Sequence, residues 1–141
     1  MEDRYLYKAK TTPKEKGEFN NVWVTGNLIV SNRKYYIHPV GNVVNVKNEI
    51  GRIIVMHEVI PDTICQCTGL KDKNGKLIWE NDIVWDSDER AFYEIIWNQE
   101  DMCWNVEDAD GHKSEFEECY GSTIEANGNR FDNSGLLESE E

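Results

Sequence analysis

Apolar and polar residues alternate with a period of two in the second half of the chain, which is the pattern of half-buried β-strands. Residues 92–97 and 102–107 show it most clearly, and the polar residues 98–101 between them are typical of a turn. One face would carry Tyr93, Ile95 and Trp97 in the first segment and Met102, Trp104 and Val106 in the second. The pattern therefore predicts an antiparallel hairpin, followed by a further turn at Asp110 and Gly111.

Another turn is predicted upstream, at Asn74 and Gly75. Gly lacks a Cβ and Asn has a short polar side chain, so this pair accepts positive φ angles and reverses the chain at low cost. Apolar residues at 77–79 and 83–85 flank polar residues, which predicts a strand, a kink and a second strand. No helical period follows Gly75, so a glycine-rich phosphate-binding loop at a helix start is not expected.

The first 60 residues predict a small antiparallel meander. A short strand is expected at 5–7, before a charged loop at 11–18. The apolar patches that follow are 22–24, 28–30 and 35–37, separated by the polar stretches 25–27 and 31–34. Between residues 43 and 59 the β-branched content favours strands over a helix. Pro61 restricts its predecessor to extended geometry and cannot donate to a sheet, so a boundary is predicted there.

The end of the chain predicts one short helical turn and one more strand. Ser114 and Glu117 have the spacing of a capping box, and Gly121 could end the turn. A final strand is expected at 124–126 and a turn at 127–129, after which the tail packs back on the body. The last four residues are expected to fray.

These elements predict a mainly β protein, β-rich α+β at most. Its 141 residues suffice for one core or two small subdomains. We expect an N-terminal meander at 1–60, a small SH3-like barrel or curled sheet at 61–121, and a C-terminal strand and tail at 122–141. No apolar run approaches the roughly 20 residues of a membrane helix, and no apolar segment follows the start of the chain, so neither membrane insertion nor export is expected.

The turn at residues 74 and 75 lies in a run that resembles the signature of the YopX family of phage and prophage proteins. That run is QCTGLKDKNGK at 66–76, followed by ENDIV at 80–84. Residues 23–28, 125–129 and 132–137 agree with the family as well. Family members usually have Gly where this chain has Asn81, and bulky aliphatic residues where it has Ala126 and Asn127. The resemblance implies a mostly β, phage-encoded protein of uncharacterised function made in a bacterial host, and it implies no catalytic residues.

Charge is distributed unevenly along the chain. The net charge of −12 combines residues 1–79, with 12 basic and 8 acidic side chains, and residues 80–141, with 3 basic and 19 acidic ones. The acidic half would be repelled by the phosphates of nucleic acid, so direct nucleic-acid binding is not expected. The same polarity suits head-to-tail self-association or docking on a basic protein, although a merely solvated acidic face is the simpler alternative.

Four of the five tryptophans fall in the aromatic-rich half, at Trp79, Trp85, Trp97 and Trp104. At strand positions such residues usually fill a small core. Those that are exposed together would instead mark a partner-binding surface.

The chain contains two partial metal-ligand patterns, and neither predicts a bound metal or cofactor. Cys65 and Cys67 would share one face of a strand, but structural zinc sites usually separate paired cysteines by two to four residues. The possible remaining ligands are Cys103, Cys119, His57 and His112. We expect small thiols in a reducing cytoplasm instead.

The second pattern is a partial calcium loop. Its members are Asp108, Asp110, Gly111 and Glu117, at positions three, five, six and twelve. Position one is Val106, which cannot ligate through its side chain, and a strand replaces the entering helix. Chance in an acidic segment explains the pattern.

The sequence contains no recognisable pairing of a nucleophile with a base and no spaced pair of carboxylates, so an enzyme is not expected. We expect a cytoplasmic, non-enzymatic accessory protein that binds copies of itself or a host or phage protein. The alternatives are a nucleic-acid-associated module that uses the basic N-terminal part, and an acidic DNA mimic that engages a DNA-binding protein.

Overall fold

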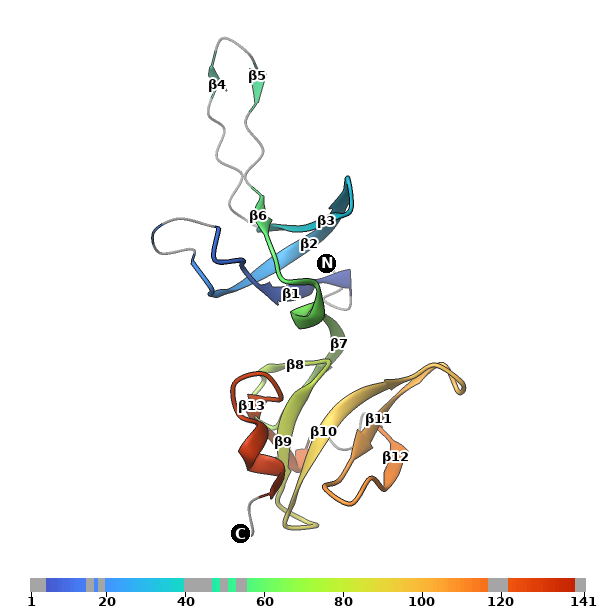
Figure 1. Ribbon diagram of the computed structural model, residues 1–141. Coiled ribbons are helices and arrows are strands. Elements are labelled where there is room, and N and C mark those ends of the chain that lie inside the picture. Colours follow the sequence, from blue (N-terminus) through green and yellow to red (C-terminus); the bar gives the residue numbers. More distant parts are fainter. Residues whose placement is uncertain are drawn as a thin grey trace. The chain divides into compact units, whose positions relative to one another are not determined.

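The computed structural model describes residues 5–14, 17, 20–39, 47–48, 51–52, 56–116 and 122–138 (Figure 1). They form two compact units, which divide between Gln66 and Cys67. Antiparallel strands make up most of both units, which confirms the mainly β prediction. Within these described ranges no helix is long and apolar enough to cross a membrane.

The N-terminal unit is built on an antiparallel sheet with the order β6-β3-β2-β1, and the first residues of β7 pair with β1. Its strands are β1 (Tyr7–Lys10), β2 (Trp23–Ser31), β3 (Lys34–Pro39), β6 (His57–Glu58) and the start of β7 (Cys65–Lys71). Strands β4 (Lys47–Asn48) and β5 (Gly51–Arg52) pair with each other. Ala9, Ile37 and Val59 form the core of this unit. The structure thus has the predicted meander, although β1 lies further along the chain than residues 5–7.

The polar stretch at 25–27 does not separate two strands, because β2 continues through it and contains Trp23 and Val24 before it and the patch 28–30 after it. The reason lies in the neighbouring strand. A Cβ on Gly26 would lie 2.0 Å from the carbonyl oxygen of His38 in β3, so this glycine allows two backbones to approach closely. The stretch at 31–34 is a turn as predicted, since Asn32 and Arg33 both have positive φ between the paired residues Ser31 and Lys34.

The C-terminal unit holds a five-stranded antiparallel sheet with the order β12-β11-β10-β9-β13, and β8 pairs with β7. Its strands are β8 (Leu77–Trp79), β9 (Asp82–Asp86), β10 (Ala91–Asn98), β11 (Cys103–Glu107), β12 (Lys113–Glu115) and β13 (Ile124–Asn129). The hairpin predicted over 92–107 is present as β10 and β11, with Trp97 opposite Trp104. In the described part of the chain the sheets do not close into a barrel, so the curled sheet is the alternative that fits.

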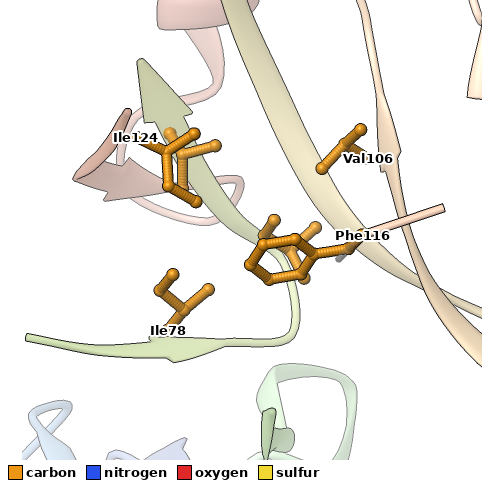
Figure 2. Packing of buried hydrophobic residues seen from close by; sticks show 6 residues of the cluster. Ile78, Val106, Phe116 and Ile124 are labelled. Atoms are coloured by element: carbon orange, nitrogen blue, oxygen red, sulfur yellow. The ribbon is translucent and has the colours of Figure 1, made fainter. Parts of the chain in front are cut away.

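One face of this sheet carries the main hydrophobic core (Figure 2). The buried side chains are Ile78, Val84, Ile95, Val106, Phe116 and Ile124. They come from five strands and from the residue that follows β12, and Figure 2 shows the Phe116 ring lying among Ile78, Val106 and Ile124. In β10 and β11 this core face carries Ile95 and Val106, which belong to the alternating sets that the sequence indicates.

The signature turn is present and is held by Asp72. Its Oδ1 accepts hydrogen bonds from the backbone N–H groups of Asn74 (2.9 Å) and Lys76 (3.0 Å). Gly75 has φ of +80° and its N–H donates to the carbonyl of Asp72 at 3.0 Å. The predicted kink after β8 is also present, because Asn81 takes a φ of +69°, a conformation that Asn tolerates better than most residues.

The same turn is bonded to the outer edge of β13. Asp72 Oδ2 accepts the N–H of Ala126 at 3.0 Å, and the N–H of Lys73 donates to the carbonyl of Ile124 at 3.0 Å. The side-chain amide of Asn74 donates to Glu125 Oε1 at 3.3 Å. A motif that is local in sequence therefore fixes a strand more than fifty residues away.

Two predictions for the end of the chain are wrong. Ser114 lies in β12, paired with Val106, because this pairing outweighs a local capping signal; the rest of the predicted helical turn, 117–121, lies outside the described residues. The stretch 127–129 belongs to β13, which contains a bulge between Ala126 and Gly128. The short helical turn near the C-terminus is η5 (Ser134–Glu138).

Candidate functional site

Of the four tryptophans that the sequence indicates as core or partner-binding residues, some lie in the interior and others near the surface. Trp79 is buried, and Trp85 is half-buried with its ring centroid 4.8 Å from that of Phe92. Trp97 and Trp104 form an edge-to-face pair with centroids 5.0 Å apart. Only Trp97 and Trp104 are therefore brought together, on facing positions of the β10–β11 hairpin.

This aromatic pair lies near the exposed end of the hairpin. Trp97 is 37% exposed and Met102, in the turn, is 65% exposed. Strand β9 pairs with β10 only at residues 91–94, and β12 pairs with β11 only at 105–107, so the end of the hairpin reaches past its neighbours (Figure 1). We call Trp97, Met102 and Trp104 the hairpin cluster. Large apolar side chains in such a place add to the surface that a partner can cover.

A cavity of about 130 Å³ opens on the core-bearing face of the same sheet. Its lining is Asp86, Glu89, Tyr93, Val106, Ser114 and Ile124. Val106 and Ile124 are buried and belong to the core, whereas Glu89 and Ser114 are exposed. The cavity thus joins an apolar interior to a polar opening.

Asp86 is the most buried polar group of this lining, with 3% of its surface exposed. Its Oδ1 accepts the backbone N–H groups of Asp88 (2.9 Å) and Glu89 (3.4 Å), which shapes the turn between β9 and β10. Among the residues that the structure describes, none donates a hydrogen bond to its Oδ2. The carboxylate therefore has acceptor capacity that the fold does not use.

A second buried carboxylate, Glu94, lies in the middle of β10. Burial raises the pKa of Glu94. The positive charge of Arg130 opposes this rise, and the negative charge of Glu107, which pairs with Glu94 from β11, adds to it. The Nη1 of Arg130 lies 3.4 Å from Glu94 Oε2, an ion pair whose geometry is not that of a hydrogen bond. Glu94 lies on the sheet face opposite the cavity.

Among the described residues, Cys65 and Cys67 are not joined by a third potential metal ligand. Cys65 and Cys67 are both fully buried in β7, and the Cys65 thiol donates to the carbonyl of Thr63 at 3.3 Å. Neither belongs to a group of three potential metal ligands within the ranges described, and Cys119 lies outside those ranges.

The calcium pattern is arranged differently from a calcium loop. Val106, its first position, is buried in the core, and Glu117 lies outside the described residues. Asp108, Asp110 and His112 do gather their ligand atoms within 4.8 Å. Asp108, however, is engaged by the backbone N–H groups of Asp110 and His112, both at 2.9 Å, which is how a short aspartate turn is built.

The N-terminal unit carries a basic and aromatic patch on one face of its sheet. Lys8 Nζ lies 5.0 Å and Lys10 Nζ 5.6 Å from the ring centroid of Trp23. Lys8 and Lys10 are two residues apart on β1, and Lys10 pairs with Trp23 on β2, so the three side chains share a face.

The sequence indicates Trp97 and Trp104 among four candidate tryptophans, but it indicates neither Met102 nor the cavity. Tyr93 and Val106 were assigned to one face of a hairpin, yet nothing in the spacing of Asp86, Glu89 and Ser114 marks them as neighbours. Asp86 does carry one local signal, since an aspartate two residues before the donor Asp88 is typical of a turn.

The comparison with curated proteins found no match. A sequence model of the family described as YopX protein matches residues 2–138. This match contains the signature turn, both units and η5, and covers nearly the whole chain. The chain therefore belongs to the YopX protein family.

Proposed function

We propose that this protein is a phage- or prophage-encoded accessory protein that works in the bacterial cytoplasm by binding another protein and not by catalysis. The observation that carries this proposal is the hairpin cluster. Trp97 and Met102 remain exposed although the core of the same sheet offers burial to other aromatic residues. Tryptophan and methionine are enriched at protein interfaces, where a few large side chains supply most of the binding free energy.

Charge indicates the kind of partner. The chain from residue 80 on holds 19 acidic and 3 basic side chains, so its surface attracts a positively charged protein and repels an acidic one. A second copy of the chain fits this description, because residues 5–66 carry 8 basic and 5 acidic side chains. A host or phage DNA-binding protein fits it too, and in that case the acidic half would take the place of DNA.

We expect replacement of the hairpin cluster to abolish most of this binding. The double variant Trp97→Ser, Met102→Asn should weaken self-association or partner capture by at least about tenfold, because interface anchors of this size typically contribute about 2 kcal/mol or more. Asparagine suits residue 102, whose φ is +54°. Sedimentation velocity over a concentration series and capture on the tagged protein from lysogenic cells measure the effect.

Val30→Thr is the matched control, since Val30 is 58% exposed but lies in the other unit. It should leave association and capture unchanged. A protein that stays monomeric at all concentrations and captures nothing specific would remove the proposal, and so would equal behaviour of the double variant and the control.

A second candidate function is binding of single-stranded nucleic acid by the N-terminal unit. The patch of Lys8, Lys10 and Trp23 favours it, because cations beside an aromatic ring on a sheet face are the means by which such proteins hold phosphates and stack bases. If it is right, a labelled oligonucleotide should bind at low salt, and Lys8→Gln, Lys10→Gln should weaken binding several-fold while Lys14→Gln does not. Absence of salt-sensitive binding removes this candidate.

A further inference from the structure

We propose that the cavity of the C-terminal unit is a receptor for an arginine side chain presented by the partner protein. This inference rests on the proposed binding function and adds to it the group that is recognised. The cavity holds about 130 Å³ and is lined by residues from five strands and one turn. For scale, an apolar cavity of roughly 150 Å³ is large enough for a benzene ring.

Asp86 provides the first reason for a cation. Asp86 Oδ2 is not among the fully buried side-chain atoms that lack a hydrogen-bond partner in the described residues, so this oxygen is accessible to a group that occupies the cavity. Asp86 lines the cavity, and only 3% of its surface is exposed. Its Oδ2 receives no hydrogen bond from the described residues. An entering N–H donor that carries positive charge would satisfy this oxygen and neutralise the carboxylate at once.

The rest of the lining fits the other parts of an arginine. Glu89 supplies a second carboxylate at the exposed side, so two acidic groups border one small space. The Tyr93 ring offers an aromatic surface on which a guanidinium group can stack. Val106 and Ile124 offer an apolar floor for the methylene groups.

This composition distinguishes arginine from a metal ion and from lysine. Calcium takes six to eight oxygen ligands, whereas three of the six described lining residues, Tyr93, Val106 and Ile124, are aliphatic or aromatic. An ammonium group is a strongly hydrated point charge, while a guanidinium group is planar, weakly hydrated and carries several donors in a fixed fork. Two carboxylates beside an aromatic ring suit the second geometry.

The face on which the cavity opens also fits a partner already engaged by the hairpin cluster. Trp97 and Trp104 lie on the same face of β10 and β11 as Tyr93 and Val106, as the pairing of Trp97 with Trp104 and of Ile95 with Val106 requires. One basic protein could therefore cover the cluster and insert an arginine into the cavity.

The test uses the full-length protein and two small probes, N-acetyl-arginine methylamide and its neutral isostere N-acetyl-citrulline methylamide. In an NMR titration of the ¹⁵N-labelled protein, the arginine probe should shift the amide signals of β9, β10 and β11 residues that border the cavity. The citrulline probe should bind at least about tenfold more weakly, because it lacks the charge that the carboxylates recognise.

Two variants locate the site. Asp86→Asn keeps an Oδ1 acceptor for the turn and should weaken the arginine probe by about tenfold; Glu89→Gln, on an exposed side chain, should weaken it several-fold. Glu115→Gln is the matched control, because Glu115 pairs with Asn105 on the opposite face of the sheet and is exposed.

The outcomes separate this inference from the function on which it rests. Equal binding of both probes, or unchanged binding in Asp86→Asn and Glu89→Gln, would overturn the arginine receptor. If this happens while the hairpin-cluster variant still loses its partner, only the receptor fails. Arginine binding in a protein that captures no partner would support the receptor and contradict the proposed function.

Discussion

Replacing Asp72 with alanine is expected to lower the free energy of unfolding of the C-terminal unit by about 3 kcal/mol. One carboxylate accepts three backbone N–H groups, two inside the signature turn and one from Ala126 in β13. The residue is only 5% exposed, so its loss leaves donors without acceptors and detaches a strand from the turn. Denaturant unfolding measured by circular dichroism tests this. Asp88→Ala, on an exposed side chain of the same unit, should stay within about 0.5 kcal/mol of the parent, and equal losses in the two variants would contradict the account.

The pH dependence of the free energy of unfolding tests the same role of Asp72. Burial works against ionisation of Asp72, but the N–H groups of Ala126, Lys76 and Asn74, together with the Lys76 charge, offset it and hold the pKa below its ordinary value. A lowered carboxyl pKa stabilises the fold fully above the unfolded pKa of about 3.9, and this contribution disappears as the pH falls through the folded pKa. The stability difference between the parent and Asp72→Asn should therefore be constant near neutral pH and shrink below about pH 4. A difference that grows on acidification would show that ionised Asp72 does not hold the turn.

Replacing Gly26 with alanine is expected to cost the N-terminal unit about 3 kcal/mol or more. The new Cβ would lie 2.0 Å from the carbonyl oxygen and 2.7 Å from the carbonyl carbon of His38, and 2.9 Å from the Cα of Pro39. All three are backbone atoms of β3, so no rotation of a side chain can relieve the overlap. Strands β2 and β3 would have to separate where they now pair over six residues.

Gly135→Ala is the matched control, because a Cβ there would have no heavy atom within 4 Å. It should change the free energy of unfolding by no more than about 0.5 kcal/mol. Thermal unfolding by calorimetry, with loss of the N-terminal unit's amide signals in NMR spectra, measures both variants. If Gly26→Ala unfolds at the temperature of the control, β2 and β3 do not approach as closely as we describe.

The sequence predicted those features that depend on neighbouring residues. The turns at Asn74 and Gly75, at 31–34 and at Asp110 and Gly111 are local, because side chains or missing Cβ atoms within a few residues allow them. The β10–β11 hairpin follows from a two-residue period. The period places Trp97 with Tyr93 and Ile95 on one face of its strand, whereas the pairing of Trp97 with Trp104 is seen only in the structure.

Features that depend on distant residues could not be read from the chain. Gly26 resembles a turn residue in sequence, yet its role is set by the backbone of β3. Ser114 has the spacing of a helix cap, but pairing with Val106 decides its conformation. Among 19 acidic residues after position 79, only the fold brings Asp86 and Glu89 together with Ser114 around one cavity.

The hydrogen bonds between the signature turn and β13 determine how copies of this protein could join. Asp72 already accepts the outer N–H of Ala126, and the Lys73 N–H already donates to the outer C=O of Ile124. That border of the five-stranded sheet therefore cannot accept a strand from another molecule there. The opposite border, at β12, is short and carries no such cover from the described residues. Any strand that another molecule adds to this five-stranded sheet is therefore expected at β12 and not beside Ala126 and Ile124.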